Sequence, residues 1–238
     1  MSALSALAAT PSDAAAESKP GLPSTIAGIA IPDSYLARQE TQQALEAETA
    51  HVYRHSVRSF VFAELISRAR KIKHDPELVY ISCVLHDIGL SDQYSTIHTR
   101  FEVDGANHAK KFLLAHGVSS ERARIAWDAI ALHPTYGLAR YKDPEVKLVS
   151  AGVITDVGAA FASELAHSDV QAVLDVLPHH GFNDAFLTVL TGYARRKPDV
   201  VDETFVEGVA IRTVPGYKPG NFYDEMKGGD AFTALGFT

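Results

Sequence analysis

A histidine and an aspartate stand side by side in an otherwise apolar run, VLHDIGL, at residues 84–90. The neighbours of His86 and Asp87 are of types that bury themselves in a core, and a buried charge is costly unless it has a partner. The pair is therefore either satisfied by other groups of the protein or engaged in holding a cation. Imidazole nitrogen and carboxylate oxygen are both metal ligands, so the second possibility is a metal site.

Two residues elsewhere in the chain could complete such a site. His55 lies on the predicted helix just before the one that carries His86, and neighbouring antiparallel helices can bring their ends face to face. Asp156, in SAGVITDVGAAFA, is again an acid among small and apolar residues. Such a mixed nitrogen and oxygen set suits Zn²⁺, Fe²⁺, Mn²⁺ or another first-row ion. Taken singly, each residue also fits a plainer role, as a hydrogen-bonded histidine or a paired aspartate.

The elements that must position these residues are predicted to be helices, because apolar residues recur mostly at three- and four-residue spacings after Pro32. Ser34 and Ser119 are N-cap types, and Pro76 and Pro144 follow aspartates at the first helical position. No convincing strand run is present. We expect helices over 35–49, 51–72, 76–89, 102–116, 119–133, 144–162, 169–177, 183–196 and 202–210.

These elements predict one all-α domain of three parts. Residues 1–24 are rich in Ala, Ser and Pro and are expected to form a flexible leader. Residues 25–214 form the helical domain. Residues 215–238 are expected to be an irregular tail packed on the domain, and the aromatic residues there would restrict the site to small molecules if they close it: Tyr217, Phe222, Tyr223, Phe232 and Phe237.

Composition excludes several classes of partner. The formal charge of −7 gives no electrostatic reason to bind nucleic acid or an anionic membrane. No run approaches the roughly 20 apolar residues of a spanning helix, and the first residues lack the features of a secretory signal. The single cysteine, Cys83, excludes an internal disulfide framework and a Cys-rich zinc site. We therefore expect a cytoplasmic protein with a small-molecule substrate, and the apolar C-terminal helices could form a homodimer face.

The ordered set His55, His86-Asp87 and Asp156, with LHDIG around the central pair, resembles the HD-domain metal-dependent superfamily. The resemblance covers about residues 50–165, which would form the core of a single-domain HD helical bundle. It implies His55, His86, Asp87 and Asp156 as the metal ligands. Members with two metals add histidines between the central pair and the distal aspartate. Here Arg100 and Phe101 stand about where the first would be, so one metal ion per chain is expected, although His98 and His108 lie nearby.

A more particular resemblance is to the cyanamide hydratase branch, carried by RHSVRSFVFAELI, CVLHDIGL, FEVDGANHAKKFLLAHG and AIALHPTYG in that order. It implies a zinc-dependent hydro-lyase that adds water across the C≡N bond of cyanamide to give urea, with iron or manganese as alternative ions. His133 is the candidate proton donor or substrate-orienting residue, and its plainer role is a helix-end histidine bonded to backbone carbonyls. Asp87 is a candidate catalytic residue as well as a ligand.

Arg58 lies one helical turn after His55 and would either support a metal ligand from behind or bind an anionic substrate group. No Gly-rich phosphate loop is present, which favours hydration over phosphate chemistry. Two alternatives stay open. One is a single-metal phosphohydrolase acting on a nucleotide or another phosphomonoester, with phosphate contacts from Arg58, Arg100, Lys110 and Lys111. The other is a helical module that binds a ligand without catalysis.

Overall fold

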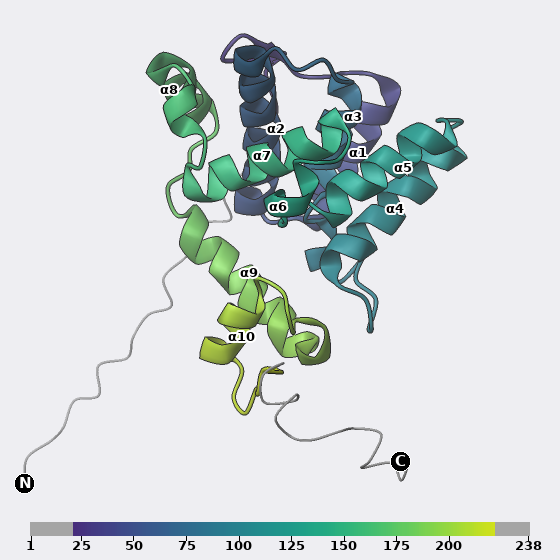
Figure 1. Ribbon diagram of the computed structural model, residues 1–238, viewed down its shortest axis with the longest axis vertical. Coiled ribbons are helices and arrows are strands. Elements are labelled where there is room, and N and C mark those ends of the chain that lie inside the picture. The colour runs from purple at the N-terminus through teal and green to yellow at the C-terminus, as the bar shows by residue number, and fades with distance from the viewer. Residues whose placement is uncertain (1–20, 222–238) are drawn as a thin grey trace, which may run out of the picture.

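Two helices packed against each other form the centre of the computed structural model, which describes residues 21–221 (Figure 1). α2 (Ala50–Arg70) is buried along most of its length and lies against α7 (Pro144–Gly158). Gly152 permits this close approach, since a Cβ atom there would lie 2.1 Å from the carbonyl oxygen of Ser59. His55 and Asp156 are therefore brought together by the tightest helix contact of the fold.

The other helices of this region surround that pair and share one hydrophobic core, here called the central core. α4 and α5 lie side by side, and α3 contacts α2, α5 and α7 (Figure 1). The bounds are α1 (Tyr35–Ala47), α3 (Pro76–Leu85), α4 (Phe101–Ala115), α5 (Ser120–Ala131), α6 (Tyr136–Ala139) and α8 (His167–Val176).

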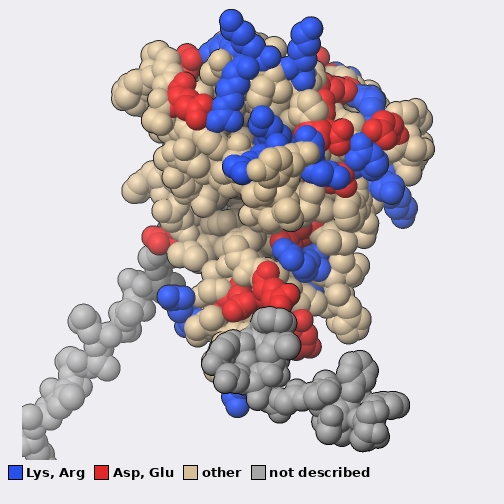
Figure 2. Space-filling view, viewed as in Figure 1, with Lys and Arg blue, Asp and Glu red and all other residues tan. Residues whose placement is uncertain are grey.

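A second, smaller hydrophobic core lies between α9 (Phe182–Arg196) and α10 (Glu207–Thr213). These helices and the 3-10 helix η3 (Pro198–Val200) between them are here called the C-terminal cap. Leu90 and Phe101 belong to this second core, so the cap is joined to the region that follows α3. In Figure 1 the cap lies below α7, and in Figure 2 the surface between α7 and α9 is hollowed and uncharged.

Local signals account for most helix ends. The side chains of Ser34, Thr49, Asp75 and Ser119 each accept a hydrogen bond from a backbone N–H of the helix that follows. Lys71, with φ of 54°, ends α2 in the left-handed conformation. Within residues 21–221, no helix combines the length and the apolar character needed to cross a membrane.

The all-α prediction is confirmed, with local differences. The helix expected to reach Gly89 ends at Leu85, because Asp87 adopts φ −104° and ψ 0° before the 3-10 helix η1 (Ile88–Leu90). The helix expected over 144–162 ends at Gly158, followed by η2 (Ala162–Glu164). The last helix begins at Glu207, not at residue 202.

Two short elements were not predicted: helix α6, and a strand pair in which β1 (Thr25–Ile26) lies antiparallel to β2 (Ile29–Ala30). Ala27 and Gly28 both have positive φ in the tight turn between the strands. Each strand is only two residues long, which explains why no strand pattern is visible in the sequence.

The outer parts of the expected leader and tail, residues 1–20 and 222–238, lie outside the described residues, and with them Phe222, Tyr223, Phe232 and Phe237. Tyr217, at the start of the expected tail, packs against the second core and donates a hydrogen bond to Asp202. The predicted domain boundaries stay predictions.

Candidate metal centre

Four segments of the central core deliver the polar side chains that the sequence singles out. α2 carries His55 and Arg58, the end of α3 carries His86 and Asp87, the turn after α5 carries His133, and α7 carries Asp156. All six residues are buried, the most accessible being Asp156 at 5%. Burial of so many polar groups in one place requires that they satisfy one another or a bound ion.

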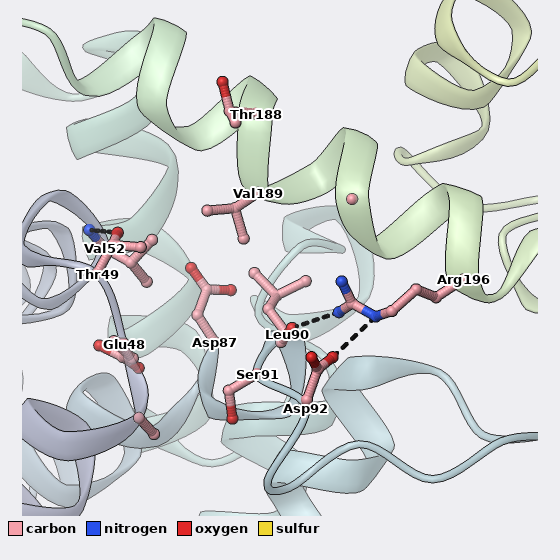
Figure 3. Close-up of a pocket in the computed structure, with 12 residues that line it drawn as sticks. Glu48, Thr49, Val52, Asp87, Leu90, Ser91, Asp92, Thr188, Val189 and Arg196 are labelled. Carbon is pink, nitrogen blue, oxygen red and sulfur yellow. Dashed lines mark hydrogen bonds and ion pairs between the residues drawn. The ribbon is translucent and has the colours of Figure 1, made fainter. Parts of the chain in front are cut away.

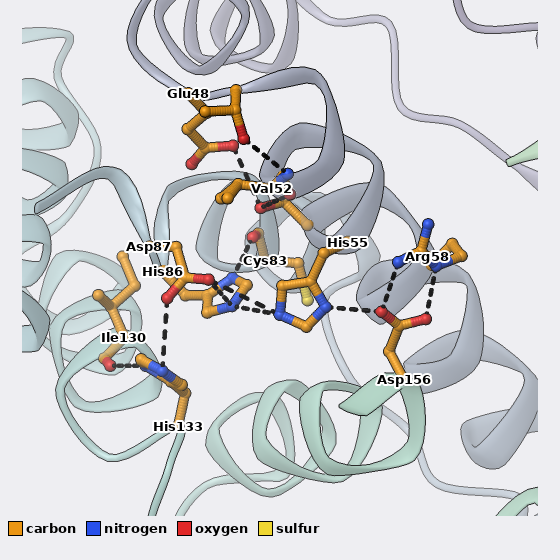
Figure 4. A network of polar contacts seen from close by, with 12 residues as sticks. Glu48, Val52, His55, Arg58, Cys83, His86, Asp87, Ile130, His133 and Asp156 are labelled. Carbon is orange, nitrogen blue, oxygen red and sulfur yellow. Dashed lines mark hydrogen bonds and ion pairs between the residues drawn. The ribbon is translucent and has the colours of Figure 1, made fainter. Parts of the chain in front are cut away.

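His55, His86 and Asp87 form a cluster whose potential ligand atoms lie within 4.8 Å of one another (Figure 4). The Nε2 atoms of the two histidines are 3.1 Å apart. Asp87 Oδ2 lies 3.2 Å from His86 Nε2 and 3.7 Å from His55 Nε2. Bonds from first-row ions to such nitrogen and oxygen atoms are about 2.0–2.2 Å long, so one ion placed between the three atoms can reach all of them.

Hydrogen bonds on the far sides of the rings determine which nitrogen atoms are free to bind. His86 Nδ1 donates to the carbonyl of Cys83 at 2.6 Å, and His55 Nδ1 donates to Asp156 Oδ2 at 2.6 Å. Since carbonyl and carboxylate oxygens only accept, the proton of each neutral ring is on Nδ1 and the Nε2 lone pairs face inward. His133 follows the same rule, because its Nδ1 donates to the carbonyl of Ile130 at 2.7 Å.

This donor set fits a cation. Two inward lone pairs 3.1 Å apart repel unless a positive charge lies between them, and Asp87 Oδ2 has no hydrogen-bond partner within residues 21–221. When no metal ion is bound, a proton supplies this charge: burial lowers the pKa of His86, but Asp87 more than offsets this and raises it. Burial likewise raises the pKa of Asp87, but the charged imidazole of His86 more than offsets this and holds that pKa at about 2, so the carboxylate is charged. A divalent metal ion supplies the charge that these three groups require. Within residues 21–221, this cluster is the place where the chain can hold such an ion.

Asp156 approaches the cluster from behind. It accepts the His55 Nδ1 hydrogen bond, and it forms a two-pronged ion pair with Arg58 at 2.6 and 2.9 Å. Arg58 also donates to the carbonyl of Pro178 at 3.1 Å. This chain of contacts fixes the orientation of the His55 ring, as carboxylates do behind metal-bound histidines. Direct ligation by Asp156 stays a prediction, and the partner of Arg58 is Asp156, not Asp87.

A cavity of about 270 Å³ opens on the inward face of the cluster. His55, His86, Asp87 and His133 line its polar end, and His133 Nε2 lies 3.9 Å from Asp87 Oδ1. Burial lowers the pKa of His133 to about 3, so its ring is neutral. The remaining walls are apolar, apart from the backbone of Gly158: Pro134, Val153, Ile154, Val157, Phe186 and Phe205.

Asp87 also lines a second cavity, of about 280 Å³, on the side towards α9 (Figure 3). This cavity is the more polar of the two, with Glu48, Ser91 and Thr188 beside apolar residues such as Val52 and Val189 in its lining. Arg196 closes part of it by pairing with Asp92 at 2.9 Å and by donating to the carbonyl of Leu90 at 3.0 Å. The two cavities that meet at Asp87 therefore differ sharply in chemical character.

Aromatic residues of the C-terminal cap complete the site, and sequence reasoning did not single them out. Phe182 stacks on the His55 ring with centroids 4.9 Å apart, and Phe186 stacks on Phe182 at 5.2 Å. Their four-residue spacing on a predicted helix is a weak signal, because such spacing is ordinary for a core-facing helix. His179, just before α9, has its Nε2 3.1 Å from the backbone carbonyl of Asp156.

Two residues near the place of a second metal ion in the sequence, Phe101 and His108, have other contacts in the structure. Phe101 is buried and its ring centroid lies 5.8 Å from that of His133. His108 Nε2 is hydrogen-bonded to Gln43 at 2.7 Å. In the part of the chain that the structure describes, the His55–His86–Asp87 cluster is the one group of at least three His, Cys, Asp or Glu residues spaced to hold a metal ion. The expectation of a single metal ion per chain stays a prediction.

Comparison with known proteins agrees with this geometry. Residues 52–157 match the HD domain family, and this stretch carries His55, His86, Asp87, His133 and Asp156. The chain is also similar to two cyanamide hydratases of Saccharomyces cerevisiae, DDI2 and DDI3. Each is 28% identical over 173 residues, which cover 70% of this chain and 76% of the relative. The resemblance to this branch is thereby confirmed, and it supports a metal-dependent HD hydratase or hydrolase.

Proposed function

We propose that this protein is a metal-dependent hydratase that adds water across the C≡N bond of a small nitrile-like substrate, with cyanamide as the first compound to test. The observation that carries the proposal is a cluster able to hold a metal ion at the floor of a largely apolar cavity. The similarity to the two yeast cyanamide hydratases supports it. The reaction consumes one water molecule and converts H₂N–C≡N to urea.

His55, His86 and Asp87 would hold the ion. Asp156, expected from the sequence as the fourth ligand, would in this arrangement act on the ion through His55, because its carboxylate is bound to Nδ1 of that ring. We propose zinc, and Fe²⁺ or Mn²⁺ also suit two imidazoles and carboxylate oxygen. When bound, a divalent ion supplies Lewis acidity, which lowers the pKa of water and polarises the C≡N group. The Asp156–Arg58 pair keeps the His55 ring in its orientation, so that Nε2 faces the cavity.

His133 would move the proton. Its Nδ1–H is held by the Ile130 carbonyl, so Nε2 enters the reaction as an acceptor. It would take a proton from the attacking water as the C–O bond forms and one C–N π bond breaks, and return it to the nitrile nitrogen. This gives C(OH)=NH, and transfer of the remaining hydroxyl proton to the same nitrogen gives the amide, whose NH₂ group then carries both protons of the water. The sequence-based expectation was that His133 donates this proton or orients the substrate, and the proposal adds that it first accepts the proton from water.

The cavity disfavours the phosphohydrolase alternative. Among the described residues, no lysine or arginine lines it. Arg58 is engaged with Asp156, Arg100 pairs with Glu102 at 2.5 Å, and Lys110 and Lys111 are exposed on α4. A phosphomonoester dianion would therefore meet Asp87 and an apolar wall without a protein cation, whereas an uncharged nitrile would not.

The test measures metal content and product in one sample. Elemental analysis should give about one divalent ion per chain, and incubation with cyanamide should release urea. His133→Gln should keep the metal and lower kcat at least about 100-fold, as expected for loss of a proton-transfer group. His116→Gln, at an exposed position, is the matched control and should match the unaltered protein. Bound metal without urea, together with hydrolysis of p-nitrophenyl phosphate, would contradict the proposal.

A further inference from the structure

The cavity above the metal cluster is larger than cyanamide requires. Its volume is about 270 Å³, and at roughly 30 Å³ for each water molecule in the liquid it has room for about nine molecules of that size. Cyanamide has only three non-hydrogen atoms. A substrate that fills the cavity therefore carries about four to six further non-hydrogen atoms.

The walls indicate the chemistry of those extra atoms. Beyond the polar floor, α7 contributes Val153, Ile154 and Val157, and the cap contributes Phe186 and Phe205. Val157 and Phe205 are 48% and 45% exposed, so the apolar lining continues to the rim of the cavity. Apolar surface gains free energy when an apolar group displaces water from it, and a polar extension would lose its hydration there.

The second cavity at Asp87 cannot serve the same substituent. Glu48, Asp92 and Arg196 line it, and an apolar group would have to remove water from these charges. The apolar cavity is thus the side of the metal cluster that suits a substrate with an apolar tail.

We propose that the substrate is a nitrile or N-substituted cyanamide, R–C≡N or R–NH–C≡N, whose apolar group R of about four to six non-hydrogen atoms extends along α7 to Phe205. The inference rests on the proposed function for the reacting C≡N group. The apolar group R is inferred separately, from the residues that line the cavity. Addition of one water molecule gives the amide R–CO–NH₂ or the substituted urea R–NH–CO–NH₂, and no other bond changes.

The first experiment measures binding without turnover. Straight-chain hydroxamic acids from acetohydroxamic to octanohydroxamic acid pair one metal-binding head with tails of increasing length. Calorimetric titration of the zinc-loaded and metal-free protein gives Kd along the series. We expect Kd to fall about fourfold for each added methylene, from about 0.8 kcal/mol per buried CH₂, and to level off near six carbons. A Kd that does not change with chain length in either form would overturn the inference.

Variants of the cavity wall test where the apolar tail of the hydroxamic acid binds. Phe205→Ala and Val157→Ala should weaken hexanohydroxamate about five- to tenfold and leave acetohydroxamate unchanged, since they remove apolar contact only. Leu187→Ala is the matched control: Leu187 is 50% exposed and adjacent to Phe186 in α9, but it does not line this cavity. Circular dichroism checks that each variant is folded. Equal effects of Leu187→Ala and Phe205→Ala would also overturn the inference.

An activity measurement separates this inference from the proposed function. We expect kcat/KM for N-butylcyanamide or hexanenitrile to exceed that for cyanamide at least tenfold. Turnover of cyanamide with no effect of chain length on Kd would keep the hydratase and overturn the apolar substituent. A Kd that depends on chain length without turnover of any nitrile would keep the substituent and overturn the C≡N reaction.

Discussion

The central core and the C-terminal cap contribute different things to the same site. The core supplies the polar groups, all of them buried and all but Asp87 held by hydrogen bonds: His55, His86, Asp87, His133 and Asp156. The cap supplies aromatic surface, with Phe182 on the far side of His55 and Phe186 on the cavity wall. The groups proposed for the reaction therefore lie in the core alone, whereas the apolar walls proposed for substrate fit come from both α7 and the cap.

The helices of the core are packed more closely on one another than the cap is packed on the core. α2 and α7 meet at backbone contact through Gly152. The cap is tied to the core by the second, smaller cluster and by polar links, among them the Lys197–Asp104 pair at 3.2 Å and the Phe101 N–H donating to Tyr193 at 2.9 Å. Regions with fewer buried contacts open at lower free-energy cost, so the cap is expected to be the less stable part.

The largest effect is expected in the metal cluster of the core. Asp87→Ala removes an anionic ligand and leaves two imidazoles, so we expect loss of bound metal and of measurable activity. Elemental analysis after dialysis checks the metal. Asp92→Ala, at an 81% exposed side chain five residues further on, should keep both. Full metal occupancy in Asp87→Ala would show that this carboxylate does not hold the ion.

Next comes the buried ion pair behind His55. Arg58→Met leaves Asp156 charged and without its partner, which should cost about 3–5 kcal/mol of unfolding free energy and weaken metal binding about 10- to 100-fold. Urea denaturation measures the unfolding free energy, and competition with a chelator measures the affinity for the metal ion.

The sign of the pH dependence follows from Asp156. Burial raises its pKa, but His55 and Arg58 more than offset this and hold it below the usual 3.8, so the pair stabilises the fold above that pH and loses its effect as pH falls. The defect of Arg58→Met should therefore shrink in acid. Arg68→Ala, which breaks the exposed pair with Asp169, should cost less than about 1 kcal/mol.

Substitutions at two glycines of α7 test how tightly the helix is packed inside the core and at its edge. Gly152→Ala places a methyl group against the Ser59 carbonyl and should cost about 3 kcal/mol, because α2 and α7 must move apart. Gly158→Ala meets no atom within 4 Å and should be neutral or slightly stabilising, since alanine favours a helix. Thermal denaturation of both variants provides the comparison, and equal losses of stability would contradict close packing at Gly152.

The smallest effect is expected at the attachment of the cap. Lys197→Met removes the ion pair with Asp104, which keeps two hydrogen bonds from Thr96, so we expect a loss of about 2 kcal/mol. Amide hydrogen exchange should quicken in α9 and α10 and stay unchanged in α2 and α7. Equal quickening in all four helices would mean that cap and core unfold as one unit.

Much of the architecture was predictable from local sequence. The caps at Ser34, Asp75 and Ser119 and the apolar spacing gave the main helices within a few residues. The ends at Leu85 and Gly158 were missed, because residues 86–90 and 159–164 continue an apolar pattern through turns and 3-10 helix. The cap was only partly predicted, since Glu203 takes a positive φ that no sequence signal marks.

The sequence by itself determined which residues can do chemistry and on which elements they lie: His55, the His86-Asp87 pair, His133 and Asp156, each a polar group among apolar neighbours. Only the tertiary structure decided how they face one another. Asp156 meets His55 across 101 residues, on the side of the ring away from the cluster, and Arg58 joins that pair. The physical reason is that periodicity fixes the face of one helix, whereas the atoms that meet between two helices depend on their packing.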